Sequence, residues 1–230
     1  MRGTLYGVGV GPGDPELLTL KALRVVREAP VIAVPAEQKE ESVAYRIVRA
    51  AYPQLEQKEV LPVPMPMTKD KQRLAASHEA GAAAVERILE EGKDVAFLTL
   101  GDPTVYSTYL YIHRLVAQAG YATEIVSGIP SFCAVAARLN VGLVEKAELL
   151  HVIPSSYPVE EALKLSGTRV LMKAGKKMGQ VKAQLEALSA DVCMIENCGM
   201  ENEKIYRSAE EIPEDAGYYS LILVKEKAEQ

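Results

Sequence analysis

Short apolar segments alternate with longer helix-like segments along most of this chain, and this alternation limits the possible fold more than any other feature. In the first half the apolar segments predict strands at 4–10, 31–34, 58–63, 94–100 and 122–127. The segments between them predict helices at 15–28, 42–51, 70–91 and 107–119. Strands joined by helical crossovers pair in parallel. The first half is therefore expected to form a parallel, doubly wound α/β sheet.

The second half repeats the alternation but ends differently. Strands are predicted at 148–153, 168–174, 191–196, 203–208 and 218–225, with helices at 131–139, 159–165 and 177–188. The last two strands are joined by a loop that contains Pro213 and Gly217, which favours antiparallel pairing and a mixed sheet. We expect two α/β domains, 1–130 and 131–230, with the active-site cleft between them.

Composition excludes several classes of protein. The 230 residues are 48% hydrophobic, which is enough for one large or two small cores. A net charge of −5, no Trp and only two Phe argue against a nucleic-acid partner. Three scattered cysteines suit a reducing compartment. With no signal peptide and no apolar run of about 20 residues, no membrane partner and a cytoplasmic location are expected.

A glycine-rich loop follows the first predicted strand, with the sequence G-V-G-P-G-D-P-E at residues 9–16. A dinucleotide fingerprint, G-x-G-x-x-G, would require a further glycine where Asp14 or Glu16 stands. The acidic ribose-binding residue of that class is also missing, because Pro35 and Ala36 follow the second strand. Asp14 can instead cap the next helix. A dinucleotide-dependent oxidoreductase and a purely structural turn both stay open as alternatives.

Other strands also end in small or polar residues. Gly101 permits close approach of a ligand to the backbone, and Asp102 can bind a ribose or an amine, or can close a structural Asx turn. Similar loops follow at 127–132, 171–177 and 195–199. Because ligands bind outside the carboxyl ends of strands in such sheets, these loops predict a small-molecule site.

Taken together, these motifs resemble the tetrapyrrole methylase superfamily, the S-adenosylmethionine (SAM)-dependent enzymes of cobalamin and sirohaem synthesis. The resemblance rests on G-V-G-P-G-D-P-E-L-L-T-L-K-A (9–22), G-D-P-T-V-Y-S (101–107), S-G-I-P-S (127–131), M-K (172–173) and E-N-C (196–198). It covers essentially the whole chain. The form G-D-P-T-V-Y-S-T-Y most resembles methyltransferases that act on carbon 20 of precorrin-2 in cobalamin (vitamin B12) biosynthesis. The resemblance implies the two-domain tetrapyrrole methylase fold, a homodimer, and SAM held in the cleft.

The matching motifs also imply particular residues. The expected cofactor-binding residues are Pro12, Leu100, Gly101, Asp102, Val105, Tyr106, Pro130, Ser131, Met172, Ala174, Asn197 and Cys198. In many relatives the third loop reads P-G-I-T-S/A, whereas Pro130 replaces the threonine here. Ser131 is therefore the expected hydroxyl donor.

A tetrapyrrole substrate carries carboxylates, whereas this protein is acidic, so basic side chains are expected to face it. Lys173 and Lys176, with Tyr106 lining the pocket, are the candidate substrate-binding residues. A second basic cluster is Lys69, Lys71 and Arg73, and ordinary surface lysines are the alternative for both clusters.

The expected chemistry needs alignment more than reactive side chains. The methyl of SAM must lie in line with an electron-rich ring carbon, so the site positions the reactants, excludes water and supplies at most one base. No residue is assigned as catalytic, and no metal site is expected, since the three histidines lack ligand spacing. Another ring carbon, another acceptor, or a non-catalytic binding module remain alternatives. Both metal-free and cobalt-bound rings are candidate substrates.

Overall fold

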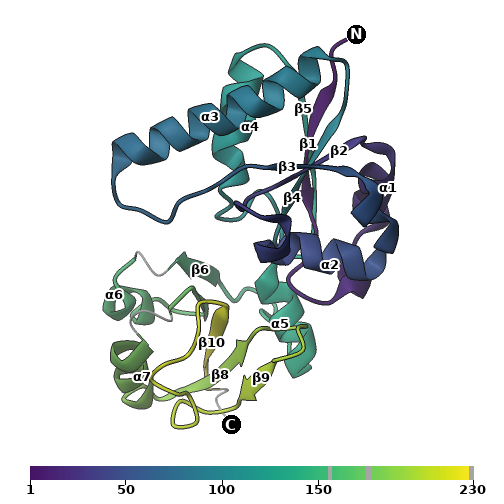
Figure 1. Ribbon diagram of the computed structural model, residues 1–230. Helices are drawn as coiled ribbons and strands as arrows, with labels where there is room; N and C mark the ends of the chain where they lie inside the picture. The colour runs from purple at the N-terminus through teal and green to yellow at the C-terminus, as the bar shows by residue number, and fades with distance from the viewer. Residues whose placement is uncertain (155–156, 175–177, 228–230) are drawn as a thin grey trace. The chain divides into compact units, whose positions relative to one another are not determined.

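The computed structural model describes residues 1–154, 157–174 and 178–227 (Figure 1). The chain divides into two compact units, Met1–Pro130 and Ser131–Gln230. Each contains one five-stranded sheet. The α/β class predicted from the sequence is confirmed, and the two units are described in turn.

The first unit is a fully parallel sheet. Its strands are β1 (Thr4–Gly9), β2 (Val31–Val34), β3 (Glu59–Pro62), β4 (Val95–Thr99) and β5 (Ala122–Val126), in the order β3-β2-β4-β1-β5. Its α-helices are α1 (Leu20–Glu28), α2 (Val43–Ala51), α3 (Lys71–Glu90) and α4 (Tyr109–Gln118). Three short 3-10 helices, η1 (Pro15–Leu17), η2 (Lys39–Glu41) and η3 (Pro53–Gln57), lie in its loops.

Helices cover both faces of this sheet, which explains why its central strands are apolar throughout. Ala96 and Leu98 of β4 belong to the core formed with α1 and α2. Val95 and Phe97 of the same strand belong to the opposite core, formed with α3 and α4. Figure 1 shows the two helix pairs on opposite sides of the strands. The doubly wound arrangement is thus present as predicted.

The helix predicted at 15–28 is divided in two. Asp14 caps the 3-10 helix η1, its side chain accepting a hydrogen bond from the Glu16 N–H. Leu18 and Thr19 are extended, and the Thr19 side chain then accepts from the Ala22 N–H to start α1. A second capping residue inside the predicted helix therefore interrupts it, because threonine hydroxyls compete for backbone N–H groups.

The second unit is a mixed sheet, again as predicted. Its helices are α5 (Ser131–Leu139), α6 (Val159–Leu163) and α7 (Met178–Glu186). Its strands are β6 (Leu150–Pro154), β7 (Thr168–Met172), β8 (Ala190–Glu196), β9 (Lys204–Tyr206) and β10 (Ser220–Glu226), in the order β6-β7-β10-β8-β9. Of the described strands in this unit, β6 and β7 pair in parallel, β10 is antiparallel to both β7 and β8, and β9 is antiparallel to β8.

Two cores sandwich this second sheet. Helix α5 packs with Val170, Ile195 and Leu223 on one face, whereas α6 and α7 pack on the other face with Met194 and Ile222. The last strand was predicted at 218–225, but β10 begins only at Ser220. The two tyrosines before it belong to a turn, a difference that bears on the site described below.

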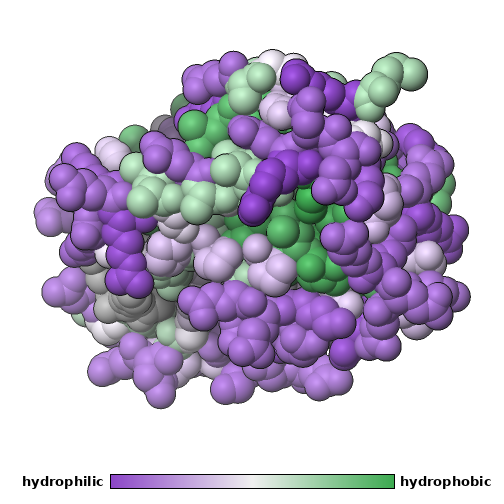
Figure 2. Space-filling view, turned by 45° about the horizontal axis from the view of Figure 1, so that its top comes forward, coloured by the Kyte–Doolittle hydropathy of each residue, from purple (hydrophilic) through white to green (hydrophobic). Residues whose placement is uncertain are grey.

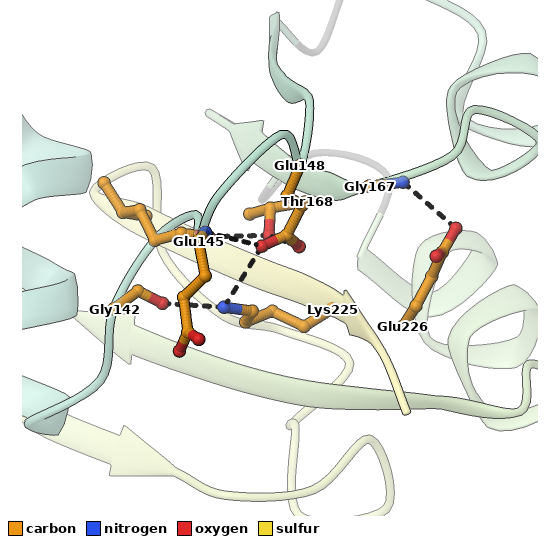
Figure 3. A network of polar contacts seen from close by, with 8 residues as sticks. Gly142, Glu145, Glu148, Gly167, Thr168, Lys225 and Glu226 are labelled. Atoms are coloured by element: carbon orange, nitrogen blue, oxygen red, sulfur yellow. Dashed lines mark hydrogen bonds and ion pairs between the residues drawn. The ribbon is translucent and has the colours of Figure 1, made fainter. Parts of the chain in front are cut away.

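A polar network ties the amino end of β7 to the loop before β6 (Figure 3). The Thr168 hydroxyl lies 2.7 Å from both the Leu143 carbonyl oxygen and Glu148 Oε1. Glu148 Oε2 lies 3.8 Å from Lys225 Nζ, which donates to the Gly142 carbonyl at 2.8 Å. Thr168 itself is fully buried. The network holds the loop before β6 against the amino end of β7, which is the end of the strand opposite to the predicted site.

The space-filling view shows hydrophilic residues over most of one face, with smaller hydrophobic areas between them (Figure 2). Leu20, Met67 and Leu149 are among the exposed large apolar side chains. Within the described ranges, no helix combines the length and the apolar character that a membrane crossing requires.

Candidate functional site

Three of the predicted site loops lie together at the carboxyl edge of the first sheet. Strand β1 lies between β4 and β5, so the loops that follow these three strands are neighbours. These loops carry the motifs at 9–16, 101–107 and 127–131. The topology therefore brings together Pro12, Leu100, Gly101, Asp102 and Val105 on one edge.

Backbone contacts hold the first two loops together. Gly11 and Gly101 form a bridge, in which the Gly101 N–H donates to the Gly11 carbonyl at 2.9 Å and the Gly11 N–H donates back at 3.3 Å. Both glycines adopt a left-handed backbone, with φ of +77° and +71°. Residues with a Cβ rarely adopt that conformation, so glycine is needed at both positions.

The third loop joins through equally close glycine contacts. A Cβ on Gly128 would lie 2.2 Å from the Gly101 carbonyl oxygen and 2.7 Å from the Gly9 carbonyl carbon. A Cβ on Gly9 would in turn lie 2.5 Å from the Gly128 nitrogen. The three loops thus meet backbone against backbone, with no room for a side chain between them.

The Asp102 carboxylate links two of these loops. One oxygen, Oδ1, accepts from the Thr104 N–H at 2.8 Å and from the Thr104 hydroxyl. The other, Oδ2, accepts from the Gly128 N–H at 3.0 Å. Asp102 is 7% exposed, so its carboxylate closes an Asx turn and also fixes the loop after β5. Of the two roles considered for this side chain, the structural one is present.

A buried tyrosine anchors the far end of the same loop. The ring of Tyr109 packs on Gly7 in β1, where an added Cβ would lie 2.0 Å from the ring. The Ser107 hydroxyl accepts from the Tyr109 N–H at 3.1 Å, and burial raises the pKa of Tyr109 well above its usual range. The segment 100–108 is therefore fixed at both ends, and the 48% exposed Tyr106 projects from it.

In the second unit, the register of β10 brings two further predicted segments to one edge. Leu221 pairs with Met172 at the end of β7, and Ser220 pairs with Glu196 at the end of β8. The segments that follow, Met172–Ala174 and Asn197–Cys198, therefore lie on the two sides of the β10 start. Ser131 is the first residue of α5. Lys176 lies outside the described residues.

Three predicted site residues have an unusual backbone. Tyr106, Lys173 and Asn197 have φ of 47°, 60° and 54°, in the left-handed region. Each such non-glycine residue carries a conformational cost, and such strain is concentrated at functional sites. The described chain holds five of these residues, and three of them are residues predicted for the site.

The thiols and histidines near these elements have ordinary structural surroundings. Burial raises the pKa of Cys133 and of Cys193, which keeps both thiols protonated near neutral pH. His113 Nδ1 lies 3.1 Å from the Tyr109 hydroxyl, and His151 Nε2 lies 3.0 Å from the Ser166 carbonyl. Among the described residues, no group of three or more His, Cys, Asp or Glu side chains is arranged to hold a metal.

Sequence reasoning missed two residues at the second edge, Tyr218 and Tyr219. Both were assigned to a strand, whereas they form the turn between Gly217 and β10 and are each 41% exposed. The Lys173 Nζ lies 5.7 Å from the centroid of the Tyr218 ring. The sequence does show a Tyr-Tyr pair directly after a glycine. The position of this pair beside Lys173 depends on the register of β10, which is a long-range property.

The fold and the site loops define a two-unit α/β protein that gathers its motif residues at the carboxyl edge of each sheet. The family model described as Tetrapyrrole (Corrin/Porphyrin) Methylases matches residues 4–213. The chain therefore belongs to the tetrapyrrole methylase family.

Two relatives and one solved structure illustrate the similarity. The chain is 36% identical to a probable cobalt-precorrin-2 C(20)-methyltransferase of Methanocaldococcus jannaschii, over 96% of this chain and 95% of the relative. It is 33% identical to the cobalt-precorrin-2 C(20)-methyltransferase of Salmonella typhimurium, over 100% and 99%. The crystal structure of uroporphyrin-III-C-methyltransferase from Thermus thermophilus matches with a TM-score of 0.72 and 25% identity, over 97% and 94% of the two chains.

Proposed function

We propose that this protein transfers a methyl group from SAM to carbon 20 of precorrin-2 or cobalt-precorrin-2, in cobalamin biosynthesis. One observation carries the proposal: a chain similar along its whole length to C(20)-methyltransferases gathers the family's motif residues at the carboxyl edges of its sheets. An oxidoreductase is disfavoured, because its support was the first glycine loop alone, and that loop is packed against Gly101.

The residues present suit SAM chemically. The half-buried Leu100, Val105 and Met172 offer apolar surface for the adenine ring and the carbon chain, with the buried Ala174 packed behind Met172's end of the strand, whereas the Ser131 hydroxyl and the Asn197 amide offer polar contacts. The remaining proposed cofactor-binding residues are Pro12, Gly101, Asp102, Tyr106, Pro130 and Cys198. Because both oxygens of Asp102 already accept hydrogen bonds, its contribution is to shape the loop and to offer its backbone.

SAM supplies a methyl group on a positively charged sulfonium. The protein's task is to hold the acceptor carbon in line with this methyl and to exclude water, and such alignment is worth several kcal/mol. No covalent nucleophile is required. The Ser107 hydroxyl accepts a hydrogen bond from the Tyr109 N–H at the start of α4, and no covalent role is proposed for it. The proton lost from the ring after transfer needs at most one base.

The assembly is inferred from the resemblance to the family, and the location and the excluded partners from the composition. We propose a homodimer in the cytoplasm, with a tetrapyrrole as the small-molecule partner and neither nucleic acid nor membrane involved. Lys173, Lys176 and Tyr106 are the proposed substrate-binding residues. Sedimentation or light scattering of the purified protein tests the dimer directly.

Mass spectrometry of the product is the direct test of the reaction. Precorrin-2, with and without inserted cobalt, is incubated anaerobically with the protein and SAM. We expect one form to gain the mass of one CH₂, with NMR placing the new methyl on carbon 20. No gain on either form, with SAM still bound, would refute the carbon-20 assignment. A methyl on another ring carbon would favour a different branch of the family.

Calorimetry with SAM tests the cofactor assignment by itself. Ser131→Ala is expected to weaken SAM binding about five- to tenfold, the value of one hydrogen bond. The matched control is Ser189→Ala, an exposed serine before β8, at the opposite end of the second sheet. Tight binding of NADH with no binding of SAM would instead support the oxidoreductase.

A further inference from the structure

An exposed pair of tyrosines lies within the second group of predicted residues. The Tyr218 and Tyr219 rings pack edge to face, with centroids 5.2 Å apart and an angle of 82° between the planes. They occupy the turn directly before β10, beside Met172–Ala174 on one side and Asn197–Cys198 on the other. Exposed aromatic side chains in such a place commonly contact ligands.

The turn that carries these tyrosines is firmly attached to the end of β8. The Gly217 N–H donates to Glu196 Oε1 at 2.7 Å, and the Ser220 hydroxyl donates to the Gly217 carbonyl at 2.6 Å. The Tyr219 carbonyl accepts from the Asn197 N–H at 3.0 Å. A Cβ on Gly217 would lie 2.6 Å from Glu196 Oε1, so a side chain there would displace the end of this carboxylate. The tyrosines are therefore held in place before any ligand binds.

Lys173 reaches the same turn from β7. Its left-handed backbone, with φ of +60°, follows Met172, the partner of Leu221. The ammonium lies 5.7 Å from the Tyr218 ring centroid, within the range of about 6 Å in which an aromatic face attracts a cation. The Tyr218 ring thus restricts a side chain that would otherwise sample many rotamers.

The surrounding charges leave this ammonium available to an anion. In the described part of the chain, Lys173 contacts the Tyr218 ring and forms no ion pair. Glu196, the acid at the end of β8 beside the turn, accepts a hydrogen bond from the Gly217 N–H. A lysine held on an aromatic ring but not neutralised can accept a carboxylate with little loss of side-chain entropy.

We propose that Tyr218 is a positioning residue for substrate binding, which holds the Lys173 ammonium for a carboxylate on the rim of the tetrapyrrole. This inference rests on the proposed function for the identity of the ligand. Tyr218 lies outside the recognised motifs. It acts through Lys173 and raises the affinity for the tetrapyrrole, not the affinity for SAM.

The first test compares two replacements of the same side chain in the methyl-transfer assay. Tyr218→Leu removes the aromatic face and is expected to raise the KM for the tetrapyrrole about three- to tenfold, with kcat and SAM affinity near wild type. Tyr218→Phe keeps the ring and is expected to retain the wild-type KM. The matched control is Tyr121→Leu, because Tyr121 precedes β5 at the amino edge of the other unit.

A double-mutant comparison isolates the link to Lys173. Lys173→Met should raise the KM as Tyr218→Leu does, and the double variant should be no worse than Lys173→Met alone. Lys164→Met, at the end of α6, is the lysine control. Increasing salt should raise the KM of wild type more steeply than that of either single variant. An unchanged KM in Tyr218→Leu, or an equal further loss in the Lys173→Met background, would overturn the proposal.

Two measurements keep this proposal separate from the reaction itself. After reductive ¹³C-methylation of lysines, the Lys173 methyl signal should show an upfield ring-current shift that Tyr218→Leu abolishes and Tyr218→Phe preserves. Uroporphyrin, an air-stable tetrapyrrole with carboxylates around its rim, serves as the binding probe. If the wild type transfers no methyl, the proposed function fails. Weaker uroporphyrin binding by Tyr218→Leu and Lys173→Met would still support the positioning role, and unchanged binding would refute it.

Discussion

The two sheets present their carboxyl edges in different ways. In the first unit, Gly9, Gly101 and Gly128 bring three loops together backbone to backbone. In the second unit, the corresponding edge is built from side chains, with Lys173 on the Tyr218 ring and Glu196 bonded to the Gly217 N–H. The first edge is fixed mainly by close backbone contacts, which the Asp102 carboxylate reinforces, and the second mainly by contacts of side chains.

This difference predicts different responses to substitution. A backbone contact leaves no space for an added atom, so a change there disturbs the fold before it disturbs binding. A side-chain contact at a half-exposed edge contributes little to stability, so a change there affects ligand affinity instead. The first edge is a rigid frame, whereas substitutions at the second edge are expected to change affinity for the proposed substrate.

The largest effect is expected from Gly128→Ala, which would break the rigid frame. Its Cβ would lie 2.2 Å from the Gly101 carbonyl oxygen, so we expect the free energy of unfolding to fall by at least about 3 kcal/mol. Gly120→Ala is the control: its φ is +85°, but nothing lies within 4 Å of the added Cβ. It should cost only about 1–2 kcal/mol, from the left-handed backbone. Urea unfolding of both variants measures the difference, and equal losses would contradict the packing argument.

The next effect concerns Asp102, which connects two loops of the frame. Asp102→Ala removes the acceptors of Thr104 and of the Gly128 N–H, and should cost about 2–4 kcal/mol of unfolding free energy. Asp102→Asn keeps one acceptor oxygen and should cost roughly half as much. Denaturation of both variants, with turnover measured in parallel, distinguishes a structural role of Asp102 from a role as the general base of the reaction. A variant Asp102→Asn that unfolds like wild type but has lost turnover would make Asp102 the base.

The sequence predicted the fold class because strand and helix periods are local properties. The parallel order of the first sheet and the mixed order of the second followed from the connections between their strands. The errors were also local in origin. Thr19 divides a predicted helix by capping α1, and Ser220 delays the last strand by bonding to Gly217.

In the sequence, glycines mark the loops that meet at the first edge. Gly11 and Gly101 are visible in the sequence as loop residues, and they do meet. The bond from the Gly128 N–H to the Asp102 carboxylate joins residues 26 positions apart, and no local pattern indicates it. The contact between Lys173 and Tyr218 depends on the register of β10, which is also a long-range property.

A smaller effect, which depends on pH, should arise from the polar network at the far end of the second sheet (Figure 3). The pKa of Glu148 is held below its usual value, chiefly by the hydrogen bond with Thr168. This carboxylate therefore contributes stability that is present above the unfolded pKa of about 4.3 and is lost as the pH falls through the lower folded value.

Thr168→Val should remove the main cause of that shift. We expect unfolding free energy to fall by about 1–2 kcal/mol at neutral pH, because the Leu143 carbonyl and Glu148 lose their partner. The loss of stability between pH 6 and pH 3 should become shallower than in wild type, by the linkage that sets its slope. Thr168→Ser, which keeps the hydroxyl, is the control. Denaturation across this pH range checks the prediction, and parallel pH curves for Thr168→Val and wild type would contradict it.

The smallest effect on the free energy of unfolding is expected at Asn197, which lies at the carboxyl edge of the second sheet. The residue is left-handed, with φ of 54°, a conformation that asparagine tolerates and alanine does not. Asn197→Ala should therefore cost about 1 kcal/mol, whereas Asn197→Gly should leave the unfolding free energy within about 0.5 kcal/mol of wild type.

If the amide contacts SAM as proposed, both variants should weaken SAM binding equally despite their different stabilities. Thermal unfolding with SAM calorimetry separates the two quantities. Equal unfolding free energies for the alanine and glycine variants would show that the left-handed backbone of residue 197 carries no cost. The backbone of the second edge would then tolerate substitution as well as its side chains do.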